Sequence, residues 1–306
     1  MVATVLVTGA TGLLGRAVLA AFTADADFSA VGTAFTRAAA SNLLVLNLTD
    51  DAAIAAAIAS VAPRIVIHCA AERRPDACEA DAARAARINV HAVYALARAA
   101  EGSGADFFQI STDYLWDGTA APYDESVPLS PLNAYGAQKA RGEAAAIAGH
   151  ARAVILRVPV LYGATTDLRE SAVTAFAAVV READNAATID DWQIRVPTHT
   201  ADVAATLLLL ARAAVAEGGA ATGQASRTAG VWHCSSSERF TRFGLVQLYG
   251  ELLGLPINHV TRLQGEPPGA KRPYDCALTT LKLEAAGFAA PHRDFRTAVL
   301  EILRAA

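Results

Sequence analysis

The sequence has few cysteines and no cluster of basic residues. Its first apolar strand starts at Val2, so we expect no targeting segment before the fold. Its four cysteines, Cys69, Cys78, Cys234 and Cys276, include no CxxC pair and no zinc-type spacing. Free thiols without a signal peptide predict a cytoplasmic protein. The net charge is -4 and Lys and Arg are scattered, so we expect no nucleic-acid surface.

Apolar residues are abundant, but they form no membrane span. They make up 53% of the chain against 18% charged residues, a composition typical of a globular protein with a large core. The most apolar stretch, residues 203–216, is shorter than the ~20 residues that a bilayer requires, and it contains Arg212. We therefore expect no membrane segment.

Short apolar strands alternate with alanine-rich helical segments through the first half. The expected strands are 2–8, 28–33, 43–46, 64–69, 106–110 and 154–158, and the expected helices are 13–23, 51–61, 81–101 and 134–148. Continuous apolar strands separated by helices are typical of a parallel sheet covered on both faces. We predict an α/β fold built on a Rossmann-type, doubly wound parallel sheet.

The alternation weakens after Pro159. The expected elements are helices at 170–181, 200–215, 240–253, 279–287 and 295–304, short strands near 189–196 and 231–235, and a loop at 218–230. We predict a Rossmann domain over residues 1–160 and a smaller C-terminal α/β substrate lobe over residues 161–306. The boundary is soft, and some later elements are expected to return to the first domain.

A glycine loop follows the first strand directly. Gly9, Gly12 and Gly15 are spaced GxxGxxG and open an amphipathic helix. The first glycine permits the tight turn, the second lets the backbone approach a pyrophosphate, and the third lets helix and strand pack closely. The phosphates would lie at the helix N-terminus, so the loop predicts a dinucleotide site.

The end of the second strand favours NADP(H) over NAD(H). An NAD site usually has Asp or Glu there, which grips the ribose 2′-hydroxyl. Residues 31–37 contain no acid, whereas Arg37 and Arg16 are suited to pair with a 2′-phosphate. The alternative for Arg37 is a solvated loop arginine.

Tyr135 and Lys139 lie one turn apart on the predicted 134–148 helix and share a face. A free tyrosine titrates near ~10, so proton transfer at neutral pH needs a nearby positive charge, which Lys139 supplies. Ser111 and Thr112 end the preceding strand, where a hydroxyl would polarise a substrate carbonyl. These residues predict carbonyl reduction with a nicotinamide cofactor.

With these motifs the sequence resembles the extended short-chain dehydrogenases/reductases. More narrowly, it is similar to dTDP-4-dehydrorhamnose reductases and to their relatives, the regulatory β subunits of methionine adenosyltransferase. Residues 111–118 and 130–139 carry the resemblance. It implies a catalytic triad of Thr112, Tyr135 and Lys139, and Asn89 matches the family's structural asparagine.

The resemblance also implies sets of ligand-binding residues. The cofactor set is Gly9, Thr11, Gly12, Leu13, Leu14, Gly15, Arg16, Arg37, Asn47, Leu48, Ala70, Ala71, Asn89, Tyr135, Lys139 and Arg157, and the substrate set is Glu72, Arg73, Trp192 and Arg272. Arg272 is placed for a sugar-nucleotide diphosphate, although a surface arginine is an equal alternative. The charged residues 72–76 line either a cleft or a partner surface, or they form a solvated loop.

Two functions follow from the resemblance. The first is an NADPH-dependent reductase of a nucleotide-linked 4-keto-deoxysugar or another carbonyl, and it is expected because the triad is intact. The second is an NADP(H)-binding regulatory subunit that binds a methionine adenosyltransferase catalytic subunit in S-adenosylmethionine synthesis. Residues 69–76 and 191–199 favour the second. The β subunits carry a C-terminal docking tail beyond the position of Ala306, which favours the first. A homodimer is one expected assembly.

Five further residues are expected to be structural. His199 is predicted to pack or to cap a helix rather than act in catalysis. Trp116 and Trp192 could stack on a ligand, but core packing is favoured. His68 and Cys69 alternate across a strand, which excludes a shared metal, and no metal site is expected.

Overall fold

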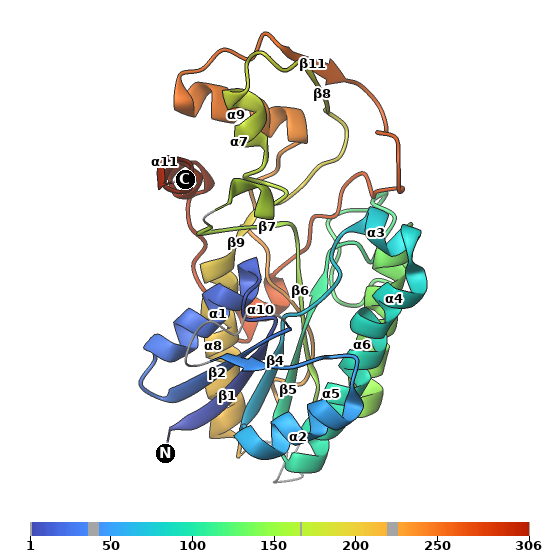
Figure 1. Cartoon of the computed structure of the whole chain (residues 1–306), viewed down its shortest axis with the longest axis vertical. Coiled ribbons are helices and arrows are strands. Elements are labelled where there is room, and N and C mark those ends of the chain that lie inside the picture. The colour runs from blue at the N-terminus through green and yellow to red at the C-terminus, as the bar shows by residue number, and fades with distance from the viewer. Residues whose placement is uncertain (1, 36–42, 166, 219–225, 306) are drawn as a thin grey trace.

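A seven-stranded parallel sheet forms the centre of the molecule (Figure 1). The structure is a computed structural model that describes residues 2–35, 43–165, 167–218 and 226–305. The strand order is β10-β6-β5-β4-β1-β2-β3, so the order reverses at β1 and the fold is doubly wound, as predicted. The strands are β1 (Ala3–Thr8), β2 (Phe28–Ala34), β3 (Leu43–Val45), β4 (Ile65–His68), β5 (Asp106–Thr112), β6 (Val154–Val158) and β10 (Gly230–His233).

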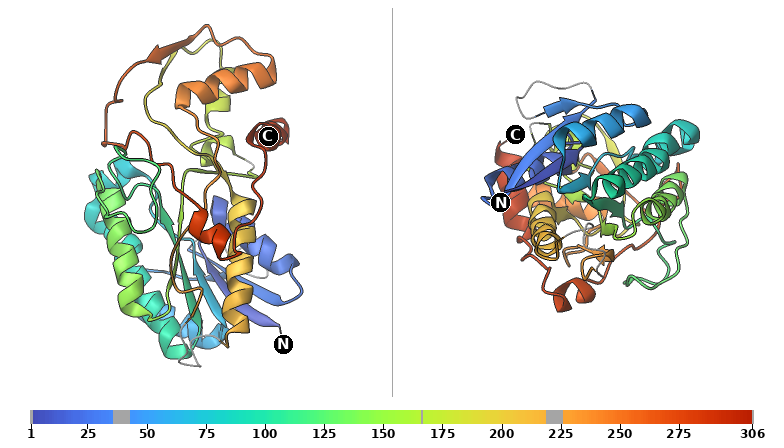
Figure 2. Two further views of the ribbon diagram at one scale, coloured as in Figure 1. Left: turned by 180° about the vertical axis from the view of Figure 1, so that it is seen from behind. Right: turned by 90° about the horizontal axis from the view of Figure 1, so that it is seen from below.

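Helices cover both faces of this sheet (Figure 2). One face carries α1 (Leu13–Ala24), α8 (Thr200–Ala216) and α10 (Leu281–Ala285), and the other carries α2 (Asp51–Val61), α5 (Ala92–Ser103) and α6 (Ala134–Gly149). Successive strand residues point to opposite faces. Val5 and Val7 therefore pack towards α1 and α8, while Leu6 packs towards α2 and α5. Continuous apolar strands are needed because both faces are buried.

The single helix expected over residues 81–101 is interrupted. A separate short helix, α3 (Pro75–Ala80), precedes the segment, which is divided into α4 (Ala82–Ala86), the π-helical turn η1 (Arg87–His91) and α5. The π turn holds buried Asn89, whose amide spans the Glu72 backbone and the side chain of Gln138. A Cβ on Gly142 would lie 2.5 Å from the Asn89 carbonyl oxygen, so glycine lets α6 approach this turn.

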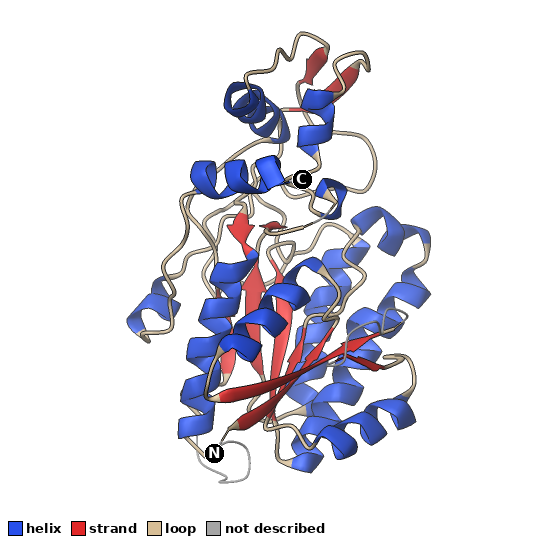
Figure 3. Cartoon of the chain, turned by 60° about the vertical axis from the view of Figure 1, so that its left-hand side comes forward, coloured by secondary structure: helices blue, strands red, loops and turns tan. Residues whose placement is uncertain are grey.

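A second group of elements lies beyond the carboxyl ends of the strands (Figures 1 and 3). Its own apolar core includes Tyr162, Leu245 and Phe295. The elements are β7 (Leu161–Tyr162), η2 (Leu168–Glu170), α7 (Phe176–Arg181), β8 (Ala187–Asp190), β9 (Thr198–His199), α9 (Arg242–Leu253), β11 (Val260–Leu263) and α11 (Phe295–Ala305). We call this group the cap.

Two expected cap elements are shorter than predicted. The helix expected from residue 170 begins at Phe176, because the hydroxyls of Ser171 and Thr174 donate to the carbonyls of Leu161 and Leu168, each at 2.7 Å. Such side-chain bonds compete with helix formation. The strand expected over residues 189–196 is confined to β8, and Ile194 and Arg195 form isolated bridges. The strand expected near residues 231–235 is β10, which pairs with β6 in the central sheet.

Candidate active site

The glycine loop connects β1 to α1. Gly9 has φ +66°, and a Cβ there would lie 2.8 Å from the Ala70 backbone. A Cβ on Gly15 would collide with the Gly9 carbonyl oxygen. At Gly12 the nearest atom to a Cβ is the Gly9 oxygen at 3.4 Å. The first and third glycines therefore serve packing, and the second leaves the loop surface open.

The start of α1 is suited to bind an anion. Gly12 is the N-cap and supplies no capping side chain. The first-turn N–H groups of Leu13 and Leu14 cannot have partners within the helix, and the helix dipole favours negative charge beside them. Phosphate groups bind at such positions. This arrangement fits the pyrophosphate of a dinucleotide.

Arg16, Asn47 and Arg37 are the residues predicted to hold the adenosine end of the dinucleotide. Arg16 donates to Thr11 O at 2.7 Å and to both carboxylate oxygens of Glu170, at 2.9 and 2.6 Å. Asn47 follows β3, and its side-chain oxygen accepts from the backbone and the hydroxyl of Thr49. Arg37 lies outside the described residues. The predicted contacts of these residues with a 2′-phosphate or adenosine stay predictions.

The loop after β4 contacts the cap through side-chain hydrogen bonds. Ala70 and Ala71 continue β4 past the glycine loop, and Glu72 accepts two hydrogen bonds from the Arg74 guanidinium, at 2.9 and 2.8 Å. Arg73 donates to the backbone carbonyl of Glu170 at 2.6 Å. Further along, Asp76 forms an ion pair with Arg272 at 2.8 Å. The structure thus brings three of the four predicted substrate residues, Glu72, Arg73 and Arg272, to the region between sheet and cap.

Helix α6 carries the predicted catalytic pair. Asn133 caps it by accepting from the Gly136 N–H at 2.9 Å. A Cβ on Gly136 would collide with the Tyr114 carbonyl oxygen, so glycine lets the helix start lie against the end of β5. There the Thr112 side chain lies near enough to the Tyr135 hydroxyl to act on its pKa. The predicted hydroxyl and tyrosine therefore meet.

Burial governs the electrostatics of this pair. It raises the pKa of Tyr135 above its usual value, although the Thr112 side chain acts in the opposite direction. Burial also lowers the pKa of Lys139 to about 8, against the attraction of Glu143. Lys139 is 3% exposed, and its Nζ donates to the Ile110 carbonyl at 2.6 Å. In this state Tyr135 is a neutral phenol, and activation requires a further positive charge beside it.

A buried ion pair behind the triad was missed from the sequence. Arg157 of β6 donates to both carboxylate oxygens of Glu143, at 2.9 and 2.7 Å. Ser111 donates to the same carboxylate at 2.5 Å. Arg157 also lies over the Trp116 ring, 5.1 Å from its centroid. The predicted contact of Arg157 with the cofactor stays a prediction. The sequence signal that could have revealed the ion pair is the position of Glu143, four residues after Lys139.

The side of the site that faces the cap contains a second polar chain. Gln193 donates to the Tyr114 hydroxyl at 3.1 Å, and Arg195 donates to Gln193 at 2.8 Å. Asp113 accepts from Thr112 at 3.2 Å, and burial raises the pKa of its carboxyl to about 7. Trp192, predicted for substrate, packs against Tyr274 with ring centroids 5.2 Å apart. Sequence reasoning missed Asp113, although it stands between two motif residues.

The structural roles predicted for two residues are confirmed. His199 caps α8 by accepting from the Ala201 N–H at 3.1 Å. Trp116 is fully buried and stacks on Tyr123 with centroids 4.6 Å apart. Within the described ranges, no three His, Cys, Asp or Glu side chains gather as metal ligands. Across the same residues, no helix has the length and apolarity needed to cross a bilayer.

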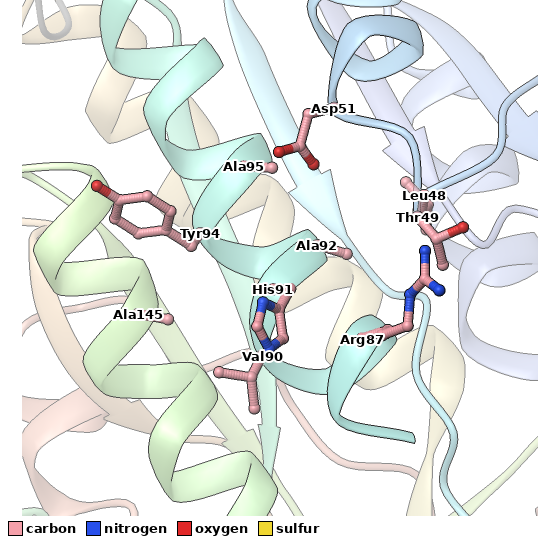
Figure 4. Close-up of a pocket in the computed structure, with 10 residues that line it drawn as sticks. All are labelled: Leu48, Thr49, Asp51, Arg87, Val90, His91, Ala92, Tyr94, Ala95 and Ala145. Carbon is pink, nitrogen blue, oxygen red and sulfur yellow. The ribbon is translucent and has the colours of Figure 1, made fainter. Parts of the chain in front are cut away.

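One pocket lies away from the triad, on the side of the sheet that carries α2, α5 and α6 (Figure 4). Its volume is about 530 Å³. The lining residues are Leu48, Thr49, Asp51, Arg87, Val90, His91, Ala92, Tyr94, Ala95 and Ala145. Only Leu48 belongs to the predicted cofactor set, and none of the lining residues belongs to the predicted triad or substrate set.

Known proteins resemble the chain over nearly its whole length. The family described as RmlD substrate binding domain matches residues 3–306. Methionine adenosyltransferase 2 subunit beta of Xenopus tropicalis is 39% identical over 299 residues, covering 97% of this chain and 86% of that protein. The dTDP-4-dehydrorhamnose reductase of Streptomyces griseus is 33% identical over 305 residues, covering 97% and 91%.

Solved structures share the fold. A dTDP-4-dehydrorhamnose reductase from Clostridium acetobutylicum has a TM-score of 0.82 and 26% identity, and the match covers 99% of each chain. The Bacillus anthracis reductase in complex with NADP also has a TM-score of 0.82, with 22% identity over 100% of this chain and 99% of that chain. At 22% identity, the similarity to the Bacillus anthracis reductase shows a shared fold and nothing more.

Proposed function

Because the chain belongs to the RmlD substrate binding domain family, we propose that it binds NADP(H) and acts as a regulatory subunit of a methionine adenosyltransferase. One observation carries this proposal. Seven curated β subunits are 38–39% identical over 97–98% of this chain, whereas the reductase relative is 33% identical. The second of the two functions predicted from the sequence is therefore favoured over the first.

The geometry of the glycine loop supports the cofactor. The uncapped N-terminus of α1 and the open face at Gly12 fit a pyrophosphate. Asn47, Leu48, Ala70 and Ala71 follow the ends of β3 and β4, beside the loop, where a dinucleotide crosses such a sheet. Lys139 would hold the nicotinamide ribose. Arg16 would bind the 2′-phosphate only by sharing its guanidinium with Glu170.

A second candidate, a carbonyl reductase, is favoured by the triad. Bound NADPH would supply a hydride. Thr112 would hydrogen-bond the substrate carbonyl, and Tyr135 would donate the proton to the developing alkoxide. The closeness of Thr112 to the Tyr135 hydroxyl and the position of Lys139 one turn away support these roles. A nucleotide-linked 4-keto-deoxysugar is the proposed substrate class.

Location and assembly are also proposals. The described cysteines are free thiols, which supports a cytoplasmic protein. The partner would be the catalytic subunit of the same organism, and a homodimer is proposed for the isolated chain.

Direct binding tests the regulatory proposal. The protein and the methionine adenosyltransferase catalytic subunit of its own organism would be mixed and separated by size-exclusion chromatography with light scattering. A complex of defined stoichiometry is expected, and NADPH should bind the protein alone with saturation. Absence of a complex at micromolar concentrations, together with NADPH oxidation in the presence of dTDP-4-keto-6-deoxy-L-mannose, would instead establish the reductase.

A further inference from the structure

Three side chains of α6 form a row that faces β5. Tyr135, Lys139 and Glu143 are spaced by four residues and share one helix face. Along β5, Tyr135 meets Thr112, Lys139 donates to the carbonyl of Ile110, and Glu143 accepts from the hydroxyl of Ser111. The carboxylate of Glu143 therefore lies one turn behind the ammonium of Lys139, and both side chains are buried.

The carboxylate of Glu143 is held in place from two strands. Arg157 of β6 grips both oxygens, and Ser111 of β5 binds one of them. Arg157 is itself fixed by the Trp116 ring and by His233, whose Nε2 lies 3.3 Å from the guanidinium. A bidentate pair fixes the orientation of the carboxylate as well as its position. Glu143 cannot rotate away from Lys139 without breaking three hydrogen bonds.

The other titratable groups around Lys139 carry no charge at neutral pH. At the end of β4, burial lowers the pKa of His68 to about 3, and just after the strand it raises the pKa of Cys69 to about 12. On α3, Cys78 acts on the neighbouring Tyr135, and burial raises the pKa of its thiol to about 11. On α6 itself, Tyr135 is a neutral phenol.

Two charged or titrating groups lie further along the neighbouring strands. Arg157 of β6 is paired with Glu143. Asp113, which follows β5, has its pKa raised to about 7 by burial. Glu143 is thus the carboxylate whose attraction supports the charge of Lys139.

We infer that Glu143, held by Arg157 and Ser111, is a positioning residue that keeps Lys139 protonated beside Tyr135 at neutral pH. This anion offsets the loss of solvation that a buried ammonium suffers. Glu143 thereby sets the upper pH at which Lys139 supports the tyrosine and the cofactor ribose. That consequence rests on the proposed cofactor-binding function, whereas the electrostatic link is a property of the cofactor-free chain.

The sequence permits a direct test because it contains three lysines, Lys139, Lys271 and Lys282. In protein with 13C-labelled lysine, the ε-carbon signal of each residue can be followed by NMR against pH and assigned with Lys271→Arg and Lys282→Arg. The Lys139 titration midpoint should fall by about one pH unit or more in Glu143→Gln, since removing an opposite charge at this range has that effect. A midpoint unchanged to within a third of a unit, in folded protein, overturns the inference.

A second variant keeps the test informative if Glu143→Gln does not fold. Glu143→Gln leaves Arg157 buried without its carboxylate, which is strongly destabilising. The double variant Glu143→Gln/Arg157→Met removes both charges and keeps similar volume. Because loss of the Arg157 cation by itself favours a charged Lys139, the double variant is compared with Arg157→Met. Its Lys139 midpoint should lie below that of Arg157→Met, and equal midpoints overturn the inference even if Glu143→Gln is unfolded.

NADPH binding, measured against pH in the same proteins, distinguishes this inference from the proposed function. Wild-type protein that fails to bind NADPH contradicts the proposed function and leaves the NMR result unaffected. If NADPH does bind, its affinity should decline at a lower pH in Glu143→Gln than in wild type. Ser111→Ala is the matched control, because it retains the carboxylate and removes one of its three hydrogen bonds, and its Lys139 midpoint should stay closer to wild type.

Discussion

Arg16 and Glu170 form a bidentate ion pair that joins the first turn of α1 to the cap across 154 residues of sequence. The same glutamate accepts from Thr165 through its side chain and from Arg73 through its backbone carbonyl. Three segments beyond the carboxyl ends of the strands therefore converge on one residue. The pair is partly exposed, with 39% of the Arg16 side chain and 26% of the Glu170 side chain accessible.

A double-mutant cycle on this pair should give a modest coupling energy. Arg16→Met, Glu170→Gln and the double variant would be compared by urea unfolding. Because solvent screens the pair, we expect a coupling of about 0.5–1 kcal/mol in the free energy of unfolding. Strict additivity of the two single variants would show that the pair contributes nothing to stability.

The second and third glycines of the loop should respond differently to alanine. Gly15→Ala places a methyl group against the Gly9 carbonyl, and we expect a loss of about 3 kcal/mol or more in the free energy of unfolding. Gly12→Ala meets only a 3.4 Å contact and has φ −80°, so its loss should stay below about 1 kcal/mol.

The same Gly12→Ala variant should also bind NADPH more weakly. The methyl group in Gly12→Ala should hinder the approach of the pyrophosphate and weaken NADPH binding at least about tenfold. Fluorescence titration with NADPH measures the effect. Wild-type affinity in folded Gly12→Ala would argue against a phosphate at this loop.

Local signals in the sequence account for the correct expectations. The glycine spacing, the Asn133 cap and the four-residue interval from Tyr135 to Lys139 each lie within a few residues. They specify the loop, the helix start and the shared face without reference to distant parts of the chain.

The missed features depend on contacts between distant segments. The π turn at Asn89 is tied to Glu72 and Gln138, and β10 joins the central sheet through β6. No local pattern predicts the Arg16–Glu170 pair. The role of Arg37 cannot be compared, because it lies outside the described residues.

Replacing Tyr135 by phenylalanine separates proton transfer from cofactor binding. The substitution removes the hydroxyl that lies near Thr112 and keeps the ring that packs against Tyr114. Any NADPH-dependent reduction of dTDP-4-keto-6-deoxy-L-mannose should fall at least about a hundredfold. NADPH affinity should change little. Reductase activity that survives in the variant would exclude Tyr135 as the proton donor.

His199 makes stability depend on pH in a predictable direction. Burial lowers its pKa to about 4, so below its usual value of 6.5 the unfolded chain binds a proton that the folded chain does not. Stability is therefore lost as pH falls from about 6.5 towards about 4. His199→Asn retains a helix-capping side chain without the titration.

The measurement compares urea unfolding of the two proteins. Between about pH 7.5 and about pH 5.5, the loss of unfolding free energy should be smaller by about 1.4 kcal/mol in His199→Asn than in wild type. Equal losses would show that His199 does not titrate with a depressed pKa in the folded state.

The most direct test of the regulatory function is the rate of S-adenosylmethionine formation by the catalytic subunit of the same organism, measured against increasing concentrations of this protein. We predict a saturable change in the rate or in the apparent KM for methionine. Tyr135→Phe should produce the same change, because regulation does not require proton transfer. A rate independent of this protein at every concentration, with NADPH present, would contradict the regulatory function.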